Sequence, residues 1–158
     1  GTGATILDTR KTTPGWRMLE KYAVQCGGAQ NHRFGLDDAV MIKDNHLAAL
    51  PRDRPLAELV QQARAAAPGL KIEVEAETVE QAVATAEAGA NIVLLDNMSV
   101  DEIQKAVKEI DGRAQTEASG GITLVNVRAI AETGVDYISV GALTHSARAV
   151  DLAMEIES

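Results

Sequence analysis

The stretch KIEVEAE, residues 71–77, decides the fold of this chain. Alternate residues of a β-strand point to the same face of a sheet. Four charged side chains would therefore share one face, and three apolar side chains the other: Lys71, Glu73, Glu75 and Glu77 against Ile72, Val74 and Ala76. A sheet face covered by helices does not tolerate four charges, because burying an unpaired charge is costly. The lumen of a barrel that opens on an active site tolerates them, provided that the charges pair or bind ions.

Short apolar runs alternate with amphipathic stretches along the whole chain. We expect strands at residues 5–7, 39–42, 72–76, 92–95, 114–118 and 137–140. We expect helices at residues 16–24, 56–66, 78–88, 100–110, 124–132 and 147–156. Such alternation is typical of a parallel sheet with both faces covered. The sequence has no linker or low-complexity tract between these units, which predicts a single catalytic domain over residues 1–158.

Six strand–helix units fit either an open doubly wound sheet or part of a (β/α) barrel. The charged face of residues 71–77 favours the barrel, and Gln115, Glu117 and Ser119 repeat its alternation of polar side chains. We therefore predict an incomplete parallel α/β barrel of the TIM type.

Local signals mark several of the predicted helix ends. Thr78 and Ser99 stand at N-cap positions, and Glu102 follows Ser99 at the spacing of a capping box. Glycines follow three predicted helices, where a left-handed residue is favoured: Gly89, Gly112 and Gly134.

Composition and charge exclude several classes of partner. The 158 residues carry a net charge of -8, and the pI is about 4.8. An acidic protein of this kind lacks the basic face that nucleic acid or an anionic membrane requires. The charge is uneven, because residues 1–46 contain six Lys or Arg and five Asp or Glu, while the rest contain nine and eighteen. The single cysteine, Cys26, cannot form an internal disulfide and fits a reducing cytoplasm.

Polar residues follow every predicted strand. They are Asp8 to Lys11, Lys43 to His46, Glu75 to Glu77, Asp96 with Asn97, Ser119 to Gly121, and Gly141 with Ala142. The carboxyl ends of parallel strands meet at one rim, which carries the active site in folds of this type. We therefore expect cations, carboxylates and glycines from six strands to converge there.

The residue types at this rim indicate anionic ligands. Glycines after the last two strands allow backbone N–H groups to approach a phosphate, and Gly120 and Gly141 have this position, with His145 close behind. Arg10, Arg33 and Lys43, with His32, supply cations for carboxylates or phosphates.

Two carboxylates at the same rim, Glu75 and Asp96, suggest a Mg²⁺ site, because Mg²⁺ favours one or two carboxylates together with phosphates and water. The alternative is that one of them pairs with Lys43 or Arg10. The sequence shows no Ser–His–Asp or thiol–histidine arrangement. Many cations without a nucleophile suit group transfer on a phosphorylated sugar, where catalysis rests on positioning and electrostatics.

Five motifs resemble one known family along essentially the whole chain. The first and most specific is LDTRKTTPGWRMLEKYAVQCGGAQNHRFGLDDAVMIKDNH at residues 7–46. It closely resembles the quinolinate phosphoribosyltransferases, also called nicotinate-nucleotide pyrophosphorylases (carboxylating). Four shorter motifs match the same family in order: EVEAET, VLLDNMS, EASGGIT and DYISVGALTHSARAVD.

The resemblance implies an activity and a cofactor. Enzymes of this family transfer the phosphoribosyl group of 5-phosphoribosyl 1-pyrophosphate to quinolinate with Mg²⁺. The products are nicotinate mononucleotide, pyrophosphate and CO₂, a step in NAD biosynthesis. The resemblance therefore implies a cytoplasmic transferase that forms a homodimer or a higher homo-oligomer.

The resemblance also implies roles for individual residues. Arg10, His32, Arg33 and Lys43 would bind the two carboxylates of quinolinate, and Lys11 would contact the phosphoribosyl pyrophosphate. Glu75 and Asp96 would lie on the metal and ribose side, and Ser119, Gly120, Gly141 and His145 would hold the 5-phosphate. Catalytic roles would fall to Lys11, Lys43, Glu75 and Asp96.

The chain also departs from the family pattern. Family members are longer, with an N-terminal α/β domain and the start of the barrel before the part seen here, and a neighbouring subunit contributes an arginine to the pocket. We expect those parts to be absent from this chain. Two alternatives follow: a barrel fragment that binds phosphate ligands without catalysis, or a related pyrophosphorylase acting on another substrate.

Overall fold

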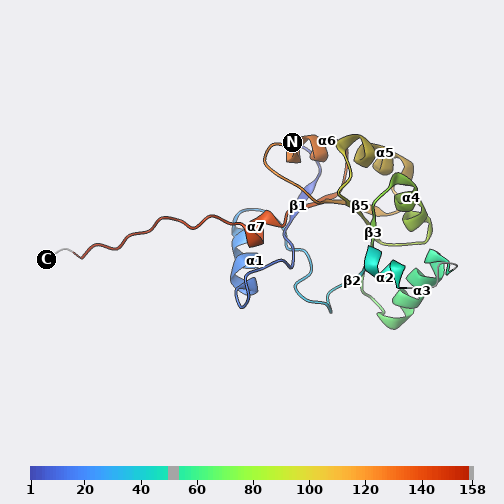
Figure 1. Cartoon of the computed structure of the whole chain (residues 1–158), viewed down its shortest axis with the longest axis horizontal. Coiled ribbons are helices and arrows are strands. Elements are labelled where there is room, and N and C mark those ends of the chain that lie inside the picture. The colour runs from blue at the N-terminus through green and yellow to red at the C-terminus, as the bar shows by residue number, and fades with distance from the viewer. Residues whose placement is uncertain (50–53, 157–158) are drawn as a thin grey trace.

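The structure is a computed structural model that describes residues 1–49 and 54–156. Six strands form one parallel sheet: β1 (Thr5–Leu7), β2 (Val40–Ile42), β3 (Ile72–Ala76), β4 (Ile92–Asp96), β5 (Gln115–Ser119) and β6 (Tyr137–Ser139). Their order across the sheet is β1-β6-β5-β4-β3-β2. The sheet curves, and within the described residues its edge strands β1 and β2 do not pair with each other (Figure 1). The predicted incomplete barrel is confirmed, and the strand limits agree with the prediction to within one residue.

The segment between the two edge strands occupies the opening of the barrel. Gln30 forms a parallel bridge with Leu7 at the free edge of β1, and the chain then continues to β2. His32 and Arg33 therefore stand between the two free edges, although they belong to no strand.

Helices cover the outer face of the sheet. They are α1 (Arg17–Cys26), α2 (Asp44–Ala48), α3 (Leu56–Ala66), α4 (Val79–Glu87), α5 (Val100–Ile110), α6 (Val127–Glu132) and α7 (Ala142–His145). The main hydrophobic core lies between the outward side chains of the strands, such as Val93 and Ile138, and helix residues such as Ala82, Ile103 and Ala106. Burial of aliphatic area here supplies most of the folding free energy. The short helices α2 and α7 were not predicted.

The predicted helix signals are confirmed. The Ser99 side chain accepts from the backbone N–H of Glu102, whose own side chain accepts from the Ser99 N–H, so α5 begins with a capping box. The Thr78 side chain accepts from the Gln81 N–H at the start of α4. Gly89, Gly112 and Gly134 all have positive φ.

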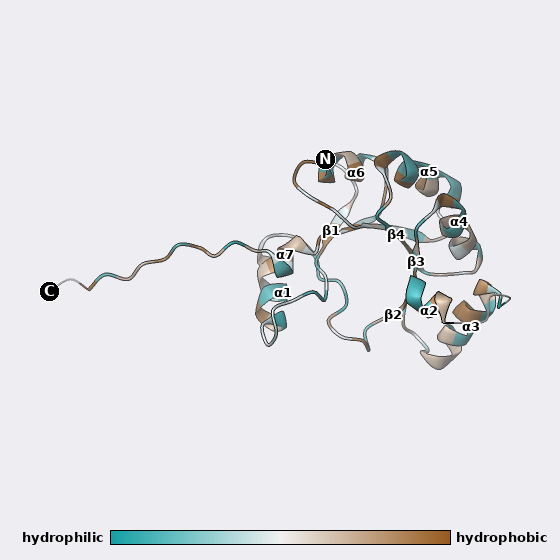
Figure 2. Cartoon of the chain, viewed as in Figure 1, coloured by the Kyte–Doolittle hydropathy of each residue, from teal (hydrophilic) through white to brown (hydrophobic). Residues whose placement is uncertain are grey.

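The predicted helix at residues 147–156 is wrong, because this fully described segment is extended and projects from the barrel (Figure 1). Its large apolar side chains alternate with small or charged ones, and all four are exposed: Val150, Leu152, Met154 and Ile156. Figure 2 shows this alternation along the segment. A repeat of two residues is the period of a strand rather than of a helix. A short helix also needs an apolar face packed on a partner, and this segment packs on none of the described residues.

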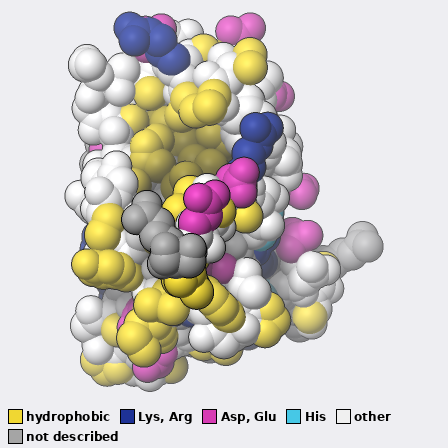
Figure 3. Space-filling view, turned by 90° about the vertical axis from the view of Figure 1, so that its left-hand side faces the viewer, with side chains coloured by type: hydrophobic (Ala, Val, Ile, Leu, Met, Phe, Trp, Pro, Cys, Tyr) yellow, Lys and Arg dark blue, Asp and Glu magenta, His cyan; other side chains and the backbone are white. Residues whose placement is uncertain are grey.

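The side of the molecule from which this segment projects carries hydrophobic side chains gathered around a hollow (Figure 3). An apolar groove lies between β1, α1 and α7, and α1 exposes Met18, Leu19 and Tyr22 beside it. Large exposed apolar patches mark surfaces that other protein covers. Among the described residues, no helix is long and apolar enough to cross a membrane.

The two faces of β3 differ as the sequence predicts. Ile72, Val74 and Ala76 are buried under helices, while the lumen side carries Glu73 and Glu75, which are only 1% and 9% exposed. The outermost charges of the motif, Lys71 and Glu77, lie beyond the strand and are exposed. The barrel lumen thus buries two carboxylates of β3 at the level where His32 enters from the opening.

Candidate active site

A pocket of about 620 Å³ opens at the carboxyl ends of the strands. Ten of the eleven predicted substrate-binding residues line it: Arg10, Lys11, His32, Arg33, Lys43, Asp96, Ser119, Gly120, Gly141 and His145. They come from the ends of β1, β2, β4, β5 and β6 and from the segment that crosses the barrel opening. The predicted convergence at one rim is confirmed; the individual roles stay predictions.

Arg10 and Arg33 form the cationic side of the pocket. Burial and the neighbouring charge of Arg10 both lower the pKa of Arg33, so the two guanidinium groups repel each other. Arg33 donates to the carbonyl of Ala39 and to the sulfur of Met41, and the buried Nε of Arg10 has no hydrogen-bond partner among the described residues. Two adjacent cations with an unused buried donor are the signature of an anion site.

A buried ion pair behind the sheet holds the segment that carries His32 and Arg33. Asp8 follows β1 and is fully buried, and its Oδ1 lies 2.5 Å from Nζ of Lys21 on α1. The same oxygen accepts from the backbone N–H of His32 at 2.8 Å, and Lys21 donates to the His32 carbonyl at 3.0 Å. The Asp8–Lys21 pair thus fixes the backbone of a pocket residue from outside the pocket.

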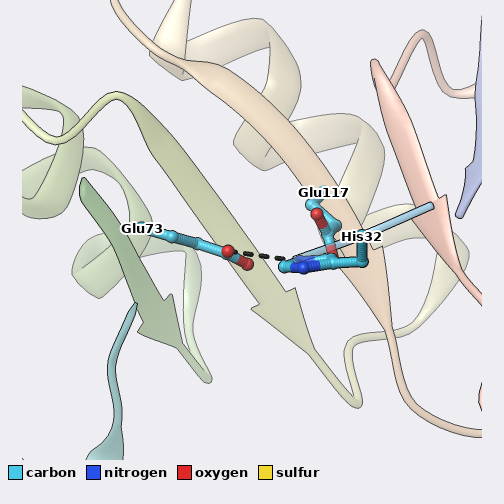
Figure 4. Close-up of side chains that lie close together, drawn as sticks. All are labelled: His32, Glu73 and Glu117. Atoms are coloured by element: carbon cyan, nitrogen blue, oxygen red, sulfur yellow. Dashed lines mark ion pairs between the residues drawn. The ribbon is translucent and has the colours of Figure 1, made fainter. Parts of the chain in front are cut away.

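Three side chains meet inside the lumen beneath the pocket (Figure 4). Nε2 of His32 lies 3.3 Å from Oε2 of Glu73 on β3 and 3.4 Å from Oε1 of Glu117 on β5. Both glutamates are 1% exposed. Sequence alternation placed them in the lumen but assigned them no role. The contact with His32 could not be predicted, because it joins residues 41 and 85 positions apart through the curvature of the sheet.

Two of the three groups, His32 and Glu73, have raised pKa values. Burial lowers the pKa of His32, but the nearby carboxylates of Glu117 and Glu73 outweigh it and raise the pKa to about 10. Burial, together with the charge of Glu117, raises the pKa of Glu73. Both shifts favour retention of a proton in the cluster at neutral pH.

The ring orientation of His32 disfavours Nε2 as a metal ligand in this cluster. The ligand atoms of His32, Glu73 and Glu117 lie within 4.8 Å of one another, close enough to surround an ion. However, the backbone N–H of Arg33 points at Nδ1 of His32 from 2.7 Å, so Nδ1 accepts and the neutral ring would carry its proton on Nε2. A histidine that binds metal through Nε2 needs its proton on Nδ1.

The two predicted metal ligands differ in their surroundings. Glu75 forms an ion pair with Nζ of Lys43, as the alternative interpretation held, and it is the one predicted substrate-binding residue that does not line the pocket. Asp96 lines the pocket, with Oδ2 accepting from the Asn97 side chain at 2.7 Å. Of the two predicted ligands, only Asp96 therefore lines the pocket.

Backbone turns form the opposite wall. Gly120 and Gly121 follow β5 with φ of 93° and 61°, a conformation that favours glycine. A side chain at Gly120 would overlap that of Asn97, and a Cβ at Gly141 would lie 2.8 Å from Nε2 of His145. These glycines keep the wall open to a ligand and leave backbone N–H groups near it, as a phosphate site requires. Asn97, which sequence reasoning left without a role, is the residue packed into this wall.

Comparison with known proteins agrees with this geometry. The model of the quinolinate phosphoribosyl transferase C-terminal domain matches residues 1–155. The chain belongs to this family. The probable nicotinate-nucleotide pyrophosphorylase (carboxylating) of Bacillus subtilis is 51% identical over 152 residues, which are 96% of this chain and 52% of that protein. The enzyme of the same name from Mycobacterium leprae is 48% identical, over 99% of this chain and 55% of its own length.

Solved structures extend the match to three dimensions. The nicotinate-nucleotide pyrophosphorylase from Francisella tularensis superposes with a TM-score of 0.89 at 43% identity, covering 96% of this chain and 53% of that one. A thiamine phosphate pyrophosphorylase from Pyrococcus furiosus, at 21% identity and a TM-score of 0.55, shares the fold alone. The chain thus spans about half the length of the quinolinate phosphoribosyl transferase relatives that it matches.

Proposed function

We propose that this chain is the barrel of a quinolinate phosphoribosyltransferase (decarboxylating), which joins quinolinate to 5-phosphoribosyl 1-pyrophosphate and releases pyrophosphate and CO₂ in NAD biosynthesis. One observation carries the proposal: Arg10 and Arg33 line one pocket as neighbouring cations, together with the glycine turns that follow β5 and β6. A diacid on one side and a phosphorylated sugar on the other fit these two walls.

The pocket residues divide the two substrates between them. Arg10, Arg33 and His32 would hold the carboxylates of quinolinate, and Ser119, Gly120, Gly141 and His145 the 5-phosphate. Lys11 would meet the pyrophosphate, since it lines the pocket after β1. Lys43 would add charge on the quinolinate side, with Glu75 holding its ammonium in place. The chemistry then needs no nucleophile, because orientation and charge stabilisation bring the pyridine nitrogen to the sugar carbon.

The proposal includes a Mg²⁺ ion, with Asp96 as the better supported of its two predicted protein ligands. When bound, Mg²⁺ would neutralise charge on the pyrophosphate, and Asp96 is the predicted ligand that is free to face it. Glu75 is the weaker candidate for a second ligand, because its Oε2 is paired with Lys43 and it does not line the pocket. The carboxylate of Asp96 would instead act from the ribose side of the pocket.

Assembly and location are also proposed. The exposed apolar face of α1 supports the expected homo-oligomer, because such a surface is normally covered. The free cysteine Cys26 supports a cytoplasmic location.

The test is calorimetric titration with quinolinate, with nicotinate as the monoacid for comparison. We expect quinolinate to bind more tightly, because a second carboxylate meets a second guanidinium. Arg33→Ala should weaken quinolinate about tenfold or more, the usual loss for a charge-assisted contact, whereas Arg128→Ala on the exposed face of α6 should not. Equal binding of the two acids would show that this barrel serves another substrate. Tight binding without turnover in the complete protein would favour the non-catalytic alternative.

A further inference from the structure

The cluster of His32, Glu73 and Glu117 beneath the pocket contains carboxylate oxygens without hydrogen-bond partners among the described residues. Neither carboxylate oxygen of Glu117 has a hydrogen-bond partner among the described residues, and Oε1 has only the longer ion pair with His32 at 3.4 Å. Oε1 of Glu73 also has no hydrogen-bond partner among them. Buried polar atoms in native proteins are nearly always paired, so each exception calls for a cause. A buried carboxylate without hydrogen bonds lowers the stability of the fold. Such groups are retained at functional sites, where a bound ligand supplies the missing partner.

The unpaired carboxylate faces the ligand site. Glu117 lines the pocket, while Glu73 lies behind it. Glu117 precedes Ser119 by two residues on β5, so the two side chains point to the same face of the sheet. Its partner His32 is the neighbour of Arg33 in the chain. Glu117 therefore stands between the residues proposed to hold quinolinate and those proposed to hold the sugar phosphate.

Neighbouring cations do not neutralise this carboxylate. The guanidinium of Arg33 donates to Ala39 and Met41, and the ammonium of Lys43 is paired with Glu75. Among the described residues, His32 is the one cationic or proton-bearing partner of Glu117, and it is shared with Glu73. The carboxylate of Glu117 on the pocket floor is therefore only partly compensated.

The proposed reaction creates a positive charge on the pyridine ring, which would lie close to the carboxylate of Glu117. The pyridine nitrogen is neutral in quinolinate and becomes cationic when its lone pair forms the bond to the sugar carbon while the bond to pyrophosphate breaks. We propose that Glu117, held in place by His32 and Glu73, stabilises the cationic pyridine ring as this bond forms. The inference rests on the proposed function, since it concerns the ring bound at that site.

An interaction of this kind contributes to catalysis. It is weak while the ring is neutral and strong once the nitrogen is charged, and only such a difference lowers the barrier. A fixed carboxylate in a site shielded from water also needs no reorganisation during the reaction. Replacing Glu117 should therefore lower kcat with little change in the KM for quinolinate.

The decisive probe is 1-methylpyridinium-2,3-dicarboxylate, which is quinolinate with a permanent charge on its nitrogen. Its methyl group stands where the sugar carbon would be attached, so the pocket has room for it if the proposed function holds. We expect the complete wild-type protein to bind this probe about tenfold or more tightly than quinolinate, a ratio typical of close charge pairs in sites shielded from water. Glu117→Gln should bind both ligands alike.

The control is Glu77→Gln, the same change at an exposed glutamate that follows β3. It should retain the wild-type preference. Equal binding of the two diacids by the wild type would overturn the role of Glu117 while leaving the proposed function intact. Failure of both to bind would overturn the proposed function and this inference with it. Should Glu117→Gln not fold, the wild-type comparison still decides, and Glu117→Asp, which keeps the charge, should keep the preference.

Discussion

Two groups of charged side chains are buried on opposite faces of the same sheet, and they differ in how they are satisfied. On the outer face, Asp8 and Lys21 are 0% and 2% exposed, and each has further partners in the backbone of His32. In the lumen, Glu73 and Glu117 are equally buried, yet three of their four oxygens lack a hydrogen-bond partner among the described residues.

The difference separates a structural ion pair from a functional one. A buried pair with complete hydrogen bonding specifies a single arrangement, here the position of the segment that carries His32 and Arg33. A buried carboxylate without partners specifies nothing by itself and costs free energy. Its presence on a pocket floor is explained if a bound ligand supplies the missing interaction partner. Each cluster can be tested by removing one member.

The largest loss of stability is expected from breaking the fully hydrogen-bonded pair of Asp8 and Lys21. Lys21→Met should reduce the free energy of unfolding by about 3–5 kcal/mol, because it leaves the Asp8 carboxylate buried without its counter-ion. Urea denaturation measures the loss. The double variant Asp8→Leu with Lys21→Met should recover part of it, since no buried charge then remains. A loss below about 1 kcal/mol would mean that the pair behaves as an exposed one.

The lumen cluster should make stability depend on pH. The pKa of His32 is raised to about 10 in the folded chain from an ordinary 6.5, so its contribution is complete below pH 6.5 and is lost as the pH rises towards 10. The raised pKa of Glu73 acts in the same direction, because the folded chain again binds more protons than the unfolded one. We expect unfolding free energy to fall between pH 6.5 and 9 by up to about 1.4 kcal/mol per pH unit.

The variant Glu117→Gln sharpens this prediction. Removing one carboxylate lowers the pKa of His32, so thermal unfolding measured from pH 6.5 to 9 should show a shallower slope than the wild type. The same substitution at exposed Glu77 should leave the slope unchanged. A slope that survives in Glu117→Gln would assign the pH dependence to groups outside the cluster.

The smallest loss of stability is expected from breaking an exposed ion pair. Arg128 and Glu132 lie one helical turn apart on α6 with Nε and Oε1 2.9 Å apart, and the two side chains are 81% and 54% exposed. Arg128→Ala should cost no more than about 0.5 kcal/mol in urea denaturation, because water and salt screen such pairs. A loss approaching that of Lys21→Met would remove burial as the explanation for the difference.

Most of the fold could be predicted because its signals are local. The apolar runs placed all six strands, and the capping residues Thr78 and Ser99 placed the starts of α4 and α5. The error at residues 147–156 was one of period, since Val150, Leu152, Met154 and Ile156 follow a repeat of two. Most of the candidate site was also predictable, because strand ends of a parallel barrel share one rim, and ten predicted residues line one pocket.

What the sequence alone determined is which residues face the lumen and which residues stand at the rim, because alternation along a strand and the direction of parallel strands require no distant information. The tertiary structure decided which of those charges meet. It paired Lys43 with Glu75, buried Lys21 against Asp8 and brought His32 between Glu73 and Glu117. These contacts depend on the curvature of the sheet and on the segment that crosses the barrel opening. No local pattern records a distance between residues so far apart in the chain.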